Sequence, residues 1–408
     1  MGNRVVITGI GVVSALGIGV ESLWCGLANG LTGIKPITSF DTSRSSSKKA
    51  AQVAHFNVHD YLSLKGLGHS SRSAQFVCTA AKLAFESAEL DLPKVNKEEL
   101  GIVLGTAFGS ANSMATFDEE CLRDGAKFVD PMSFPNTVNN SPASHLSVLL
   151  RVEGLSMTLS TGSASGLDVI DYAARVLAKG QVRIVLAGGY EELSLLSHAY
   201  LSEAKFLSGS RDHDVEYSVP LDRNRNGFFL GEGAAVLVLE RLDDALARGS
   251  RIIAEVAGFG TSFCLKPSQV VDSESMAMQR ALLSAGLESQ DIGCIFASAN
   301  GSIDGDKAER LSIEKTFGSR ACDVPATAIK SMIGECGGAT GAMQVIAAAL
   351  SSRFNAVPPT KDFQEHDPGS LLKRVSSKEQ IADCDAVLVN SFNGQHQNSS
   401  LVVKKFMN

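Results

Sequence analysis

PLDRNRNGFFLGEGAAVLVLE, residues 220–240, is the stretch that shows the architecture of this chain most directly. Turns at Gly227, Gly231 and Gly233 lead into an apolar run, residues 233–240, which lacks the polar alternation of a half-exposed strand. Such a run is typical of a strand buried on both faces of a sheet. Because similar runs alternate with helical patterns, we expect an α/β fold with a mostly parallel sheet covered on both faces. The other predicted strands include residues 4–10, 101–105 and 181–189, and the predicted helices include residues 20–30 and 73–90.

An internal repeat divides the chain into two parts. AFESAEL (84–90) and GIVLGTAFGS (101–110) match ALLSAGL (281–287) and GCIFASANGS (293–302). A repeat of this kind predicts two similar halves, which we place at residues 1–250 and 251–408. No Pro- or Ser-rich linker separates them, so we expect the halves to share one core. Chance similarity between two βα units is the alternative.

Composition excludes several functional classes. The 408 residues are 44% hydrophobic and 20% charged, with a formal net charge of -7 and no Lys/Arg-rich run, so nothing predicts nucleic-acid binding. The sequence has no run of 18 apolar residues that would predict a membrane span, and we expect a cytoplasmic protein. The eight cysteines are scattered without a C-x-x-C pair, which predicts reduced, mostly buried thiols and neither a metal site nor a cofactor.

TLSTGSASGLDVIDYAARVLAKG, residues 158–180, has the pattern of a nucleophile elbow. Small residues surround Ser163, and an apolar helical pattern follows until Gly180. A tight turn exposes a side chain at this position, and the helix N-terminus stabilises negative charge beside it. An ordinary helix cap is the alternative reading of the same residues.

At this point the chain resembles a known family, the β-ketoacyl-ACP synthases, which are the condensing enzymes of fatty acid and polyketide synthesis. The resemblance implies a thiolase-like fold of two similar halves in five layers, αβαβα, and two-fold dimers. Besides the two stretches above, the motifs that carry it are VVITGIGVVSALG (5–17), WCGLANG (24–30), PMSFPN (131–136), LAGGYEE (186–192), ANGSIDGDKAE (299–309), KSMIGECGGATGA (330–342) and NSFNGQHQN (390–398).

The chain departs from this family at the three positions that carry its chemistry. The resemblance implies Cys, His and His where this sequence has Ser163, Asn300 and Glu335. Lys330 matches the family and is expected to support the site, and Asp306, Lys307 and Glu309 match as well. The family's oxyanion hole uses backbone N–H groups at the positions of Ser163 and Gly394, where Gly394 replaces a Phe.

These replacements argue against decarboxylative condensation. A hydroxyl group ionises far less readily than the thiol it replaces, so Ser163 needs a strong adjacent base. The enolate formed when malonyl-ACP loses CO₂ needs two hydrogen-bond donors. Asn300 could donate one, but an ionised Glu335 only accepts hydrogen bonds. Its charge would also repel the malonyl carboxylate, by roughly 4 kcal/mol at about 4 Å and an effective dielectric constant near 20.

We therefore expect a non-catalytic subunit. The pattern is similar to the chain length factor, or pseudo-ketosynthase, of type II polyketide synthases, although many chain length factors carry Gln at the position of Ser163. The resemblance implies a heterodimer with an active ketosynthase, a role in shaping the tunnel for the growing chain, and acyl carrier protein docked through the partner.

Three alternatives remain open at the level of sequence, and one of them is a pure scaffold with no link to acyl chemistry. The chain could be an acyltransferase or thioester hydrolase in which Ser163 is the nucleophile, Glu335 the general base and Asn300 an oxyanion donor. It could also be an active synthase with different chemistry, using Cys336 or His396. The non-catalytic explanations are that Cys336 is a small buried residue, and that His396 is an imidazole in a solvated loop or at an interface.

Some residues are candidates for the walls of the tunnel or the dimer interface. Phe228 and Phe229 are expected either to line an acyl tunnel or to belong to the core. Residues 127–150 correspond to the family's dimer-contact region, and Asn139, Asn140 and His145 are the polar candidates within it.

Overall fold

The computed structural model describes residues 4–62, 70–211, 215–372, 380–392 and 397–407. Its main sheet contains two sets of strands in the same spatial order: β6-β5-β7-β8-β1 and β11-β10-β14-β15-β9. β1 and β9 pair antiparallel and join the two sets. The first set is formed by β1 (Val5–Ser14), β5 (Leu100–Gly105), β6 (Ser156–Leu159), β7 (Ile184–Glu191) and β8 (Gly233–Arg241), and the second by β9 (Ala254–Phe263), β10 (Cys294–Phe296), β11 (Ala326–Thr327), β14 (Ala386–Phe392) and β15 (Gln397–Lys404).

Strand direction repeats between the two sets as well. β5 is parallel to β6 and β7, and β10 is parallel to β11 and β14. The remaining neighbours, β7 with β8 and β8 with β1, are antiparallel, as are β14 with β15 and β15 with β9. The sheet is therefore mixed, and the expectation of a mostly parallel sheet is wrong. Both faces of β8 are buried although it runs antiparallel, so its apolar run reports burial and not direction.

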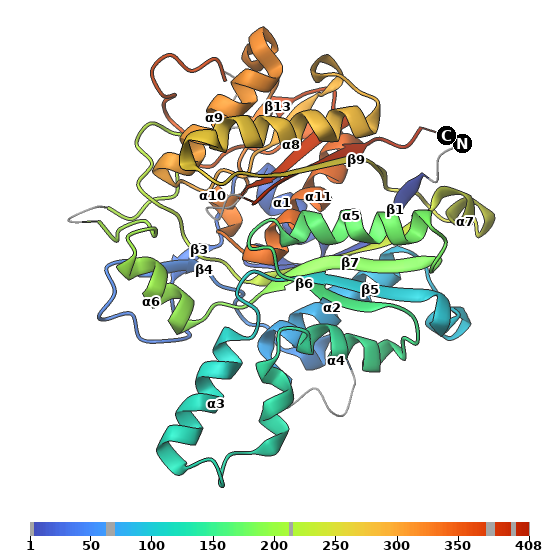
Figure 1. Ribbon diagram of the computed structural model, residues 1–408, viewed down its shortest axis with the longest axis vertical. Coiled ribbons are helices and arrows are strands. Elements are labelled where there is room, and N and C mark those ends of the chain that lie inside the picture. Colours follow the sequence, from blue (N-terminus) through green and yellow to red (C-terminus); the bar gives the residue numbers. More distant parts are fainter. Residues whose placement is uncertain (1–3, 63–69, 212–214, 373–379, 393–396, 408) are drawn as a thin grey trace.

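Helices cover the strands in three layers and give the αβαβα arrangement (Figure 1). α5 (Ser165–Ala178) and α11 (Gly337–Phe354) lie between the two sets of strands and form the largest apolar core with them. α2 (Arg72–Ser87) and α4 (Ser141–Leu150) cover the outer face of the first set. α8 (Val270–Ala285) and α9 (Ile303–Phe317) cover the outer face of the second set. The thiolase-like fold predicted from the sequence is confirmed.

α5 and α11 approach each other closely because glycines line their contact. A Cβ atom on Gly166 would lie 2.6 Å from the carbonyl oxygen of Gly338, a separation that real side chains do not tolerate. α11 is buried along nearly its whole length, which agrees with its uniformly apolar and small side chains.

The repeat seen in the sequence has a structural counterpart. Residues 84–90 overlap the end of α2 and residues 101–110 begin in β5, while residues 281–287 overlap the end of α8 and residues 293–302 contain β10. α2 packs on β1, and α8 packs on β9 in the same way. The boundary placed at residue 250 lies between α7 (Leu242–Ala247) and β9 and stays a prediction.

One extension stands apart from the layers. α3 (Ala111–Asp124) and the short helix η5 (Pro131–Thr137) project away from the body below α4 (Figure 1). α3 has no buried residue. None of the helices in the described part of the chain combines the length and apolar character that a membrane crossing requires. Further elements are α1 (Val20–Ala28), β3 (Ile34–Pro36), β4 (Lys49–Ala51), α6 (Leu195–Glu203) and α10 (Lys330–Ile333), and α10 carries Lys330.

Candidate active site

Ser163 occupies the turn that leads into α5, as the sequence predicts. Gly162 has a φ of 68°, a left-handed conformation that favours glycine and turns the chain sharply. The carbonyl oxygen of Ser163 accepts a hydrogen bond of 2.8 Å from the hydroxyl of Ser391, at the end of β14. Asp168 accepts hydrogen bonds from Thr161 (2.6 Å) and Ser399 (2.5 Å), which fixes the turn against β15.

Ser163 is half-buried at this turn. No residue in the described ranges donates a hydrogen bond to its hydroxyl group or accepts one from it. A serine nucleophile requires a base within hydrogen-bonding distance. The turn therefore has the shape of a nucleophile elbow, and the part of the chain that the structure describes supplies no activating partner for it.

Asn300, Glu335 and Lys330 meet in one buried polar cluster. The Lys330 ammonium lies 2.7 Å from Oε2 of Glu335, and both side chains are almost fully buried. Asn300 donates from Nδ2 to the same oxygen at 3.0 Å. Thr340 donates to the other carboxylate oxygen, Oε1, at 3.1 Å. Each oxygen of Glu335 thus has a partner.

Main-chain contacts hold Glu335 in this position. Its N–H donates to the carbonyl oxygen of Phe229 at 2.8 Å, and its own carbonyl accepts from Gly231 at 2.9 Å. Asn300 is fixed as well, because its N–H donates to Asp306 at 3.0 Å and its Oδ1 accepts from the N–H of Ser302 at 3.0 Å. The cluster is therefore rigid on both sides.

This arrangement changes the electrostatic expectation for Glu335. Its charge is paired with Lys330, so repulsion of an incoming malonyl carboxylate is weaker than an isolated carboxylate would cause. The amide of Asn300, expected from the sequence as a free oxyanion donor, has one N–H committed to Glu335. For an enolate, the main deficiency of the site is therefore its shortage of free hydrogen-bond donors. The negative charge of Glu335 matters less, because Lys330 is paired with it.

Asp306 and Glu309 support the site from α9. Asp306 accepts from the N–H groups of Leu221, Asn300 and Gly301. Glu309 accepts from the N–H of Ser298 at 2.7 Å and from the amide of Asn390 at 3.0 Å. Burial raises the pKa of Asp306, and it raises the pKa of Glu309 to about 7. Lys307, which also matched the family, is exposed and forms no ion pair with any described residue.

Ser163 lies at the same end of the central layer as this cluster. Ser391, which holds Ser163, is followed by Phe392, whose N–H donates to the hydroxyl of Ser298 at 2.8 Å. Ser298 precedes Asn300 by two residues. The close contact of α5 with α11 brings the turn before each helix to one place, which joins the three predicted positions in space.

Neither of the alternative catalytic roles suggested by the sequence, Glu335 as a base for Ser163 or Cys336 as a nucleophile, is supported by the contacts of these residues. Glu335 forms no hydrogen bond with Ser163, so none of the described residues serves as a general base for that hydroxyl. Cys336 is buried, and its Sγ lies 3.2 Å from the carbonyl oxygen of Ile333. Burial, followed by the charge of Glu335, raises the pKa of the Cys336 thiol well above its ordinary value. His396 and Gly394 lie outside the described residues.

The residues predicted for the tunnel or the interface fall into two groups. Phe229 is buried, and Phe228 is partly buried against the apolar cluster around Leu207. Asn139 accepts from Ser110 N–H at 3.3 Å, Asn140 is exposed at the start of α4, and Nε2 of His145 lies 3.1 Å from Oδ1 of Asn136. Burial lowers the pKa of His145. Their tunnel and interface roles stay predictions.

Sequence reasoning missed Glu191, a buried acid at the end of β7. Its carboxylate accepts from the N–H groups of Ala107 (2.8 Å), Phe108 (3.2 Å) and Gly338 (3.1 Å). Burial raises its pKa to about 7 in spite of these donors. Glu191 therefore ties the loop after β5 to the start of α11. The signal available in the sequence was the acid pair inside LAGGYEE, which interrupts an apolar run.

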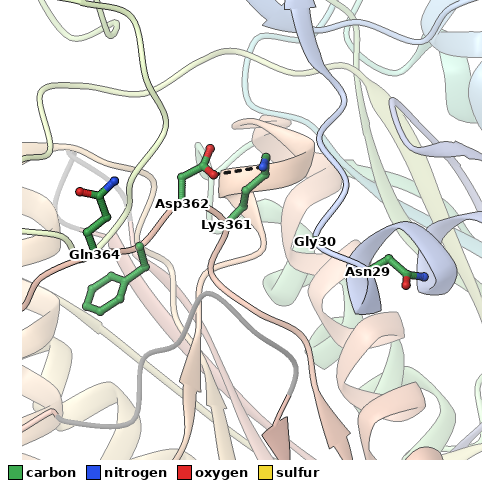
Figure 2. A pocket seen from close by; sticks show the side chains of 6 residues that line it. Asn29, Gly30, Lys361, Asp362 and Gln364 are labelled. Atoms are coloured by element: carbon green, nitrogen blue, oxygen red, sulfur yellow. Dashed lines mark hydrogen bonds and ion pairs between the residues drawn. The ribbon is translucent and has the colours of Figure 1, made fainter.

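A surface pocket of about 300 Å³ lies elsewhere, beside the end of α1 (Figure 2). Figure 2 shows the ion pair of Lys361 and Asp362 within it. None of the predicted site residues lines it. Among the described residues, no group of three or more His, Cys, Asp or Glu side chains is placed to hold a metal ion. The pocket lining is Asn29, Gly30, Lys361, Asp362, Phe363 and Gln364.

Comparisons with known proteins agree with the fold and with the motifs. The family described as "Beta-ketoacyl synthase, N-terminal domain" matches residues 2–245, and "Beta-ketoacyl synthase, C-terminal domain" matches residues 253–364. The chain is 32% identical to 3-oxoacyl-[acyl-carrier-protein] synthase 2 of Coxiella burnetii over 408 residues, covering 99% of each chain. It is 33% identical to the enzyme of the same name from Vibrio cholerae over 412 residues, again covering 99% of each.

Solved structures of ketosynthases share the fold of this chain. The ishigamide ketosynthase/chain length factor matches with a TM-score of 0.92 and 30% identity, covering 100% of both chains. A type II PKS ketosynthase, bound to the hexaketide and in complex with its acyl-carrier protein, matches with a TM-score of 0.88 and 25% identity, again covering 100% of both.

Proposed function

The chain belongs to the β-ketoacyl synthase family, and from this premise we propose that it is a member that performs no condensation of its own. It pairs with an active β-ketoacyl-ACP synthase as a chain-length-factor-like subunit and shapes the tunnel for the acyl or polyketide chain. The family places the chain in fatty acid or type II polyketide biosynthesis. The relatives named 3-oxoacyl-ACP synthase 2 are enzymes, so the non-catalytic role depends on the site of this chain.

One observation carries the proposal: Asn300, Lys330 and Glu335 satisfy one another. An enolate formed by decarboxylation needs two preorganised donors aimed at its oxygen. The carboxylate of Glu335 cannot donate, and it holds one N–H of Asn300. Losing one oxyanion donor typically costs about 10²–10³ in rate. The replacement of one donor by Glu335, the commitment of an Asn300 N–H to it, and a serine for which no described residue acts as a base all argue against condensation by this chain.

The surface of α3, η5 and α4 supports a partner of this kind. Leu122, Phe128 and Val148 have exposed fractions of 88%, 77% and 79%. Met132 and Phe134 are also exposed on η5. η5 contacts both α3 and α4, so these exposed apolar side chains lie on adjoining elements, and we expect another protein to cover them. We propose that an active ketosynthase covers it, and that acyl carrier protein docks through that partner.

The test is to purify the chain alone and together with its partner synthase. Incubated alone with acyl-ACP and malonyl-ACP, the chain should give no β-ketoacyl product by mass spectrometry. The co-expressed pair should elongate, and Ser163→Ala in this chain should leave its rate unchanged. Replacing the nucleophilic cysteine of the partner with alanine is the matched control and should abolish elongation.

Elongation by the isolated chain at the rate of an ordinary synthase, lost in Ser163→Ala, would contradict the proposal. The ratio of the two proteins after size-exclusion chromatography tests the pairing separately. A chain that elutes only as a homodimer when the synthase is present contradicts the heterodimer.

A further inference from the structure

The extension formed by residues 111–138 has few polar attachments to the body of the protein. For residues 111–135, every hydrogen bond and ion pair that the structure describes ends within the extension or at Ser110, the residue before it. α3 lies against α6 and η5 against α4, yet none of residues 111–138 is buried. Inside the extension, the rings of Phe117 on α3 and Phe134 on η5 meet edge to face at 5.9 Å. The extension is therefore one piece, and its orientation depends on how it joins the body.

The two ends of the extension are fastened to each other. The hydroxyl of Ser110 donates to the carbonyl oxygen of Val138 at 2.8 Å, and the N–H of Ser110 donates to Oδ1 of Asn139 at 3.3 Å. Gly109 has a φ of 63°, and a Cβ atom at this position would overlap the side chain of Asn139. We call these four residues the neck. It closes the extension at its base, joining positions that are 28 residues apart in the sequence.

Tyr190 anchors the neck from inside the molecule. Its side chain is fully buried at the end of β7, where it belongs to the apolar core beneath α2 and α4. The phenol hydroxyl, which needs a partner when it is buried, donates to the carbonyl oxygen of Asn139. Thr106 is its second hydrogen-bond partner, and Oγ1 of Thr106 also accepts from the N–H of Gly109 at 2.9 Å. One rigid side chain from a central strand is thus connected to both sides of the neck.

We propose that Tyr190 and the neck hold the extension in one orientation before the partner binds, which makes Tyr190 a positioning residue of the partner surface. This rests on the proposed function, because it takes the exposed apolar side chains of the extension as part of the surface that an active ketosynthase covers. A surface that is already ordered loses less conformational freedom on binding, so it binds more tightly. Tyr190 is 0% exposed and cannot touch the partner itself. Its effect on association therefore passes through the neck.

The neighbouring residue, Glu191, separates the neck from the rest of the site. Its carboxylate accepts from the N–H of Phe108 at 3.2 Å and from the N–H of Gly338, at the start of α11, at 3.1 Å. These bonds do not involve the hydroxyl of Tyr190. Removing that hydroxyl should therefore loosen the extension and leave the start of α11 unchanged, which distinguishes a local effect on the neck from a general loss of stability.

The experiment compares the full-length chain with Tyr190→Phe and Ser110→Ala, which each remove one hydroxyl group that donates to the neck. The control is Thr79→Val, because the hydroxyl of Thr79 on α2 is also buried but has no partner among the described residues. Amide hydrogen exchange of the isolated chain is followed by mass spectrometry. In peptides from residues 111–138, both neck variants should exchange about fivefold faster, as expected for losing one hydrogen bond of average net strength. Peptides from α11, and all peptides of Thr79→Val, should exchange as in the wild type.

Association with the partner synthase, measured by surface plasmon resonance, gives the second readout. Tyr190→Phe and Ser110→Ala should each weaken it by about fivefold, and Thr79→Val should not. Unchanged exchange of residues 111–138 in both neck variants would overturn the inference. Faster exchange with unchanged association would overturn it as well, since the neck would then not serve the partner surface. The exchange measurement needs neither partner nor acyl substrate, so its failure is distinct from failure of the proposed function, which co-purification and elongation decide.

Discussion

The ammonium group of Lys330 lies 2.7 Å from Oε2 of Glu335, and the amide of Asn300 donates to the same oxygen at 3.0 Å. A buried ion pair is not in itself a source of stability, because removing two charges from water costs about as much as their attraction returns. Its members become dependent on each other, since either charge alone would be left buried without a counter-ion.

Lys330→Met should therefore destabilise the fold strongly. We expect a loss of roughly 3–5 kcal/mol in the free energy of unfolding, because Glu335 is left as an unpaired buried charge. Urea denaturation at pH 7 measures this. The double variant Lys330→Met with Glu335→Gln should recover a large part of the loss. Equal instability of the single and double variants would show that the pair does not govern stability here.

Ser163→Cys separates the two demands of condensation. A thiol at the N-terminus of α5 ionises more readily than a hydroxyl, so this variant should accept an acyl group from acyl-ACP. The isolated variant should not elongate it, because Glu335 still replaces one of the two donors that the enolate requires and occupies an N–H of Asn300. Intact-protein mass spectrometry follows the adduct and product analysis follows elongation, with Ser163→Ala as the control without a nucleophile. Efficient elongation by Ser163→Cys alone would contradict the assigned role of Asn300 and Glu335.

Glu191→Gln tests the tie between the loop after β5 and α11. The Gln amide cannot accept from all the N–H groups that Glu191 serves, and each unsatisfied buried donor costs about 1–3 kcal/mol. With a pKa of about 7 raised from 4.5, the wild type should also gain stability as pH falls from 7 toward 4.5, and the variant should lack this gain. Thermal unfolding at pH 5 and pH 8 provides both comparisons. An identical pH response would rule out this titration.

Cys336 should be unreactive in the native protein. Its thiol is buried and its raised pKa leaves almost no thiolate at neutral pH, whereas Cys25 is exposed. Treatment with N-ethylmaleimide followed by peptide mapping should label Cys25 rapidly and Cys336 only after unfolding. Rapid labelling of Cys336 in the folded protein would contradict this prediction and would make Cys336 a candidate nucleophile again.

Val148→Asp should weaken association with the partner synthase by at least about tenfold, which corresponds to roughly 1.4 kcal/mol. The side chain of Val148 is exposed on α4, so the isolated chain should fold normally. Leu283→Asp is the matched control, because Leu283 is 81% exposed on α8, away from the proposed contact. Both variants are compared by co-purification and by thermal unfolding of the isolated chain. Equal loss of binding in the two would argue against the proposed surface.

Local patterns in the sequence predicted most of the fold. The apolar runs at 101–105 and 233–240 correspond to β5 and β8, and the pattern at 73–90 corresponds to α2. The first strand extends beyond its predicted end, to Ser14. Strand direction could not be read in the same way, because burial on both faces produces one composition in parallel and antiparallel strands.

The candidate site was predictable in its membership but not in its contacts. Motif spacing singled out Asn300 and Glu335, which are separated by two α-helices, a short 3₁₀ helix and a strand along the chain. It could not show that Lys330 neutralises Glu335, because that contact depends on the turn of α10 and on Thr340 one helix later.

The glycine contact between α5 and α11 has a consequence for how members with this architecture could diverge. Where the two backbones meet, at Gly166 and Gly338, there is no side chain to shorten and any added side chain would clash. Accommodating a longer or bulkier growing chain therefore cannot come from spreading the two halves. Such a change is easier at the periphery. The extension formed by α3 and η5 can lengthen, shorten or change its residues without disturbing the packed central helices.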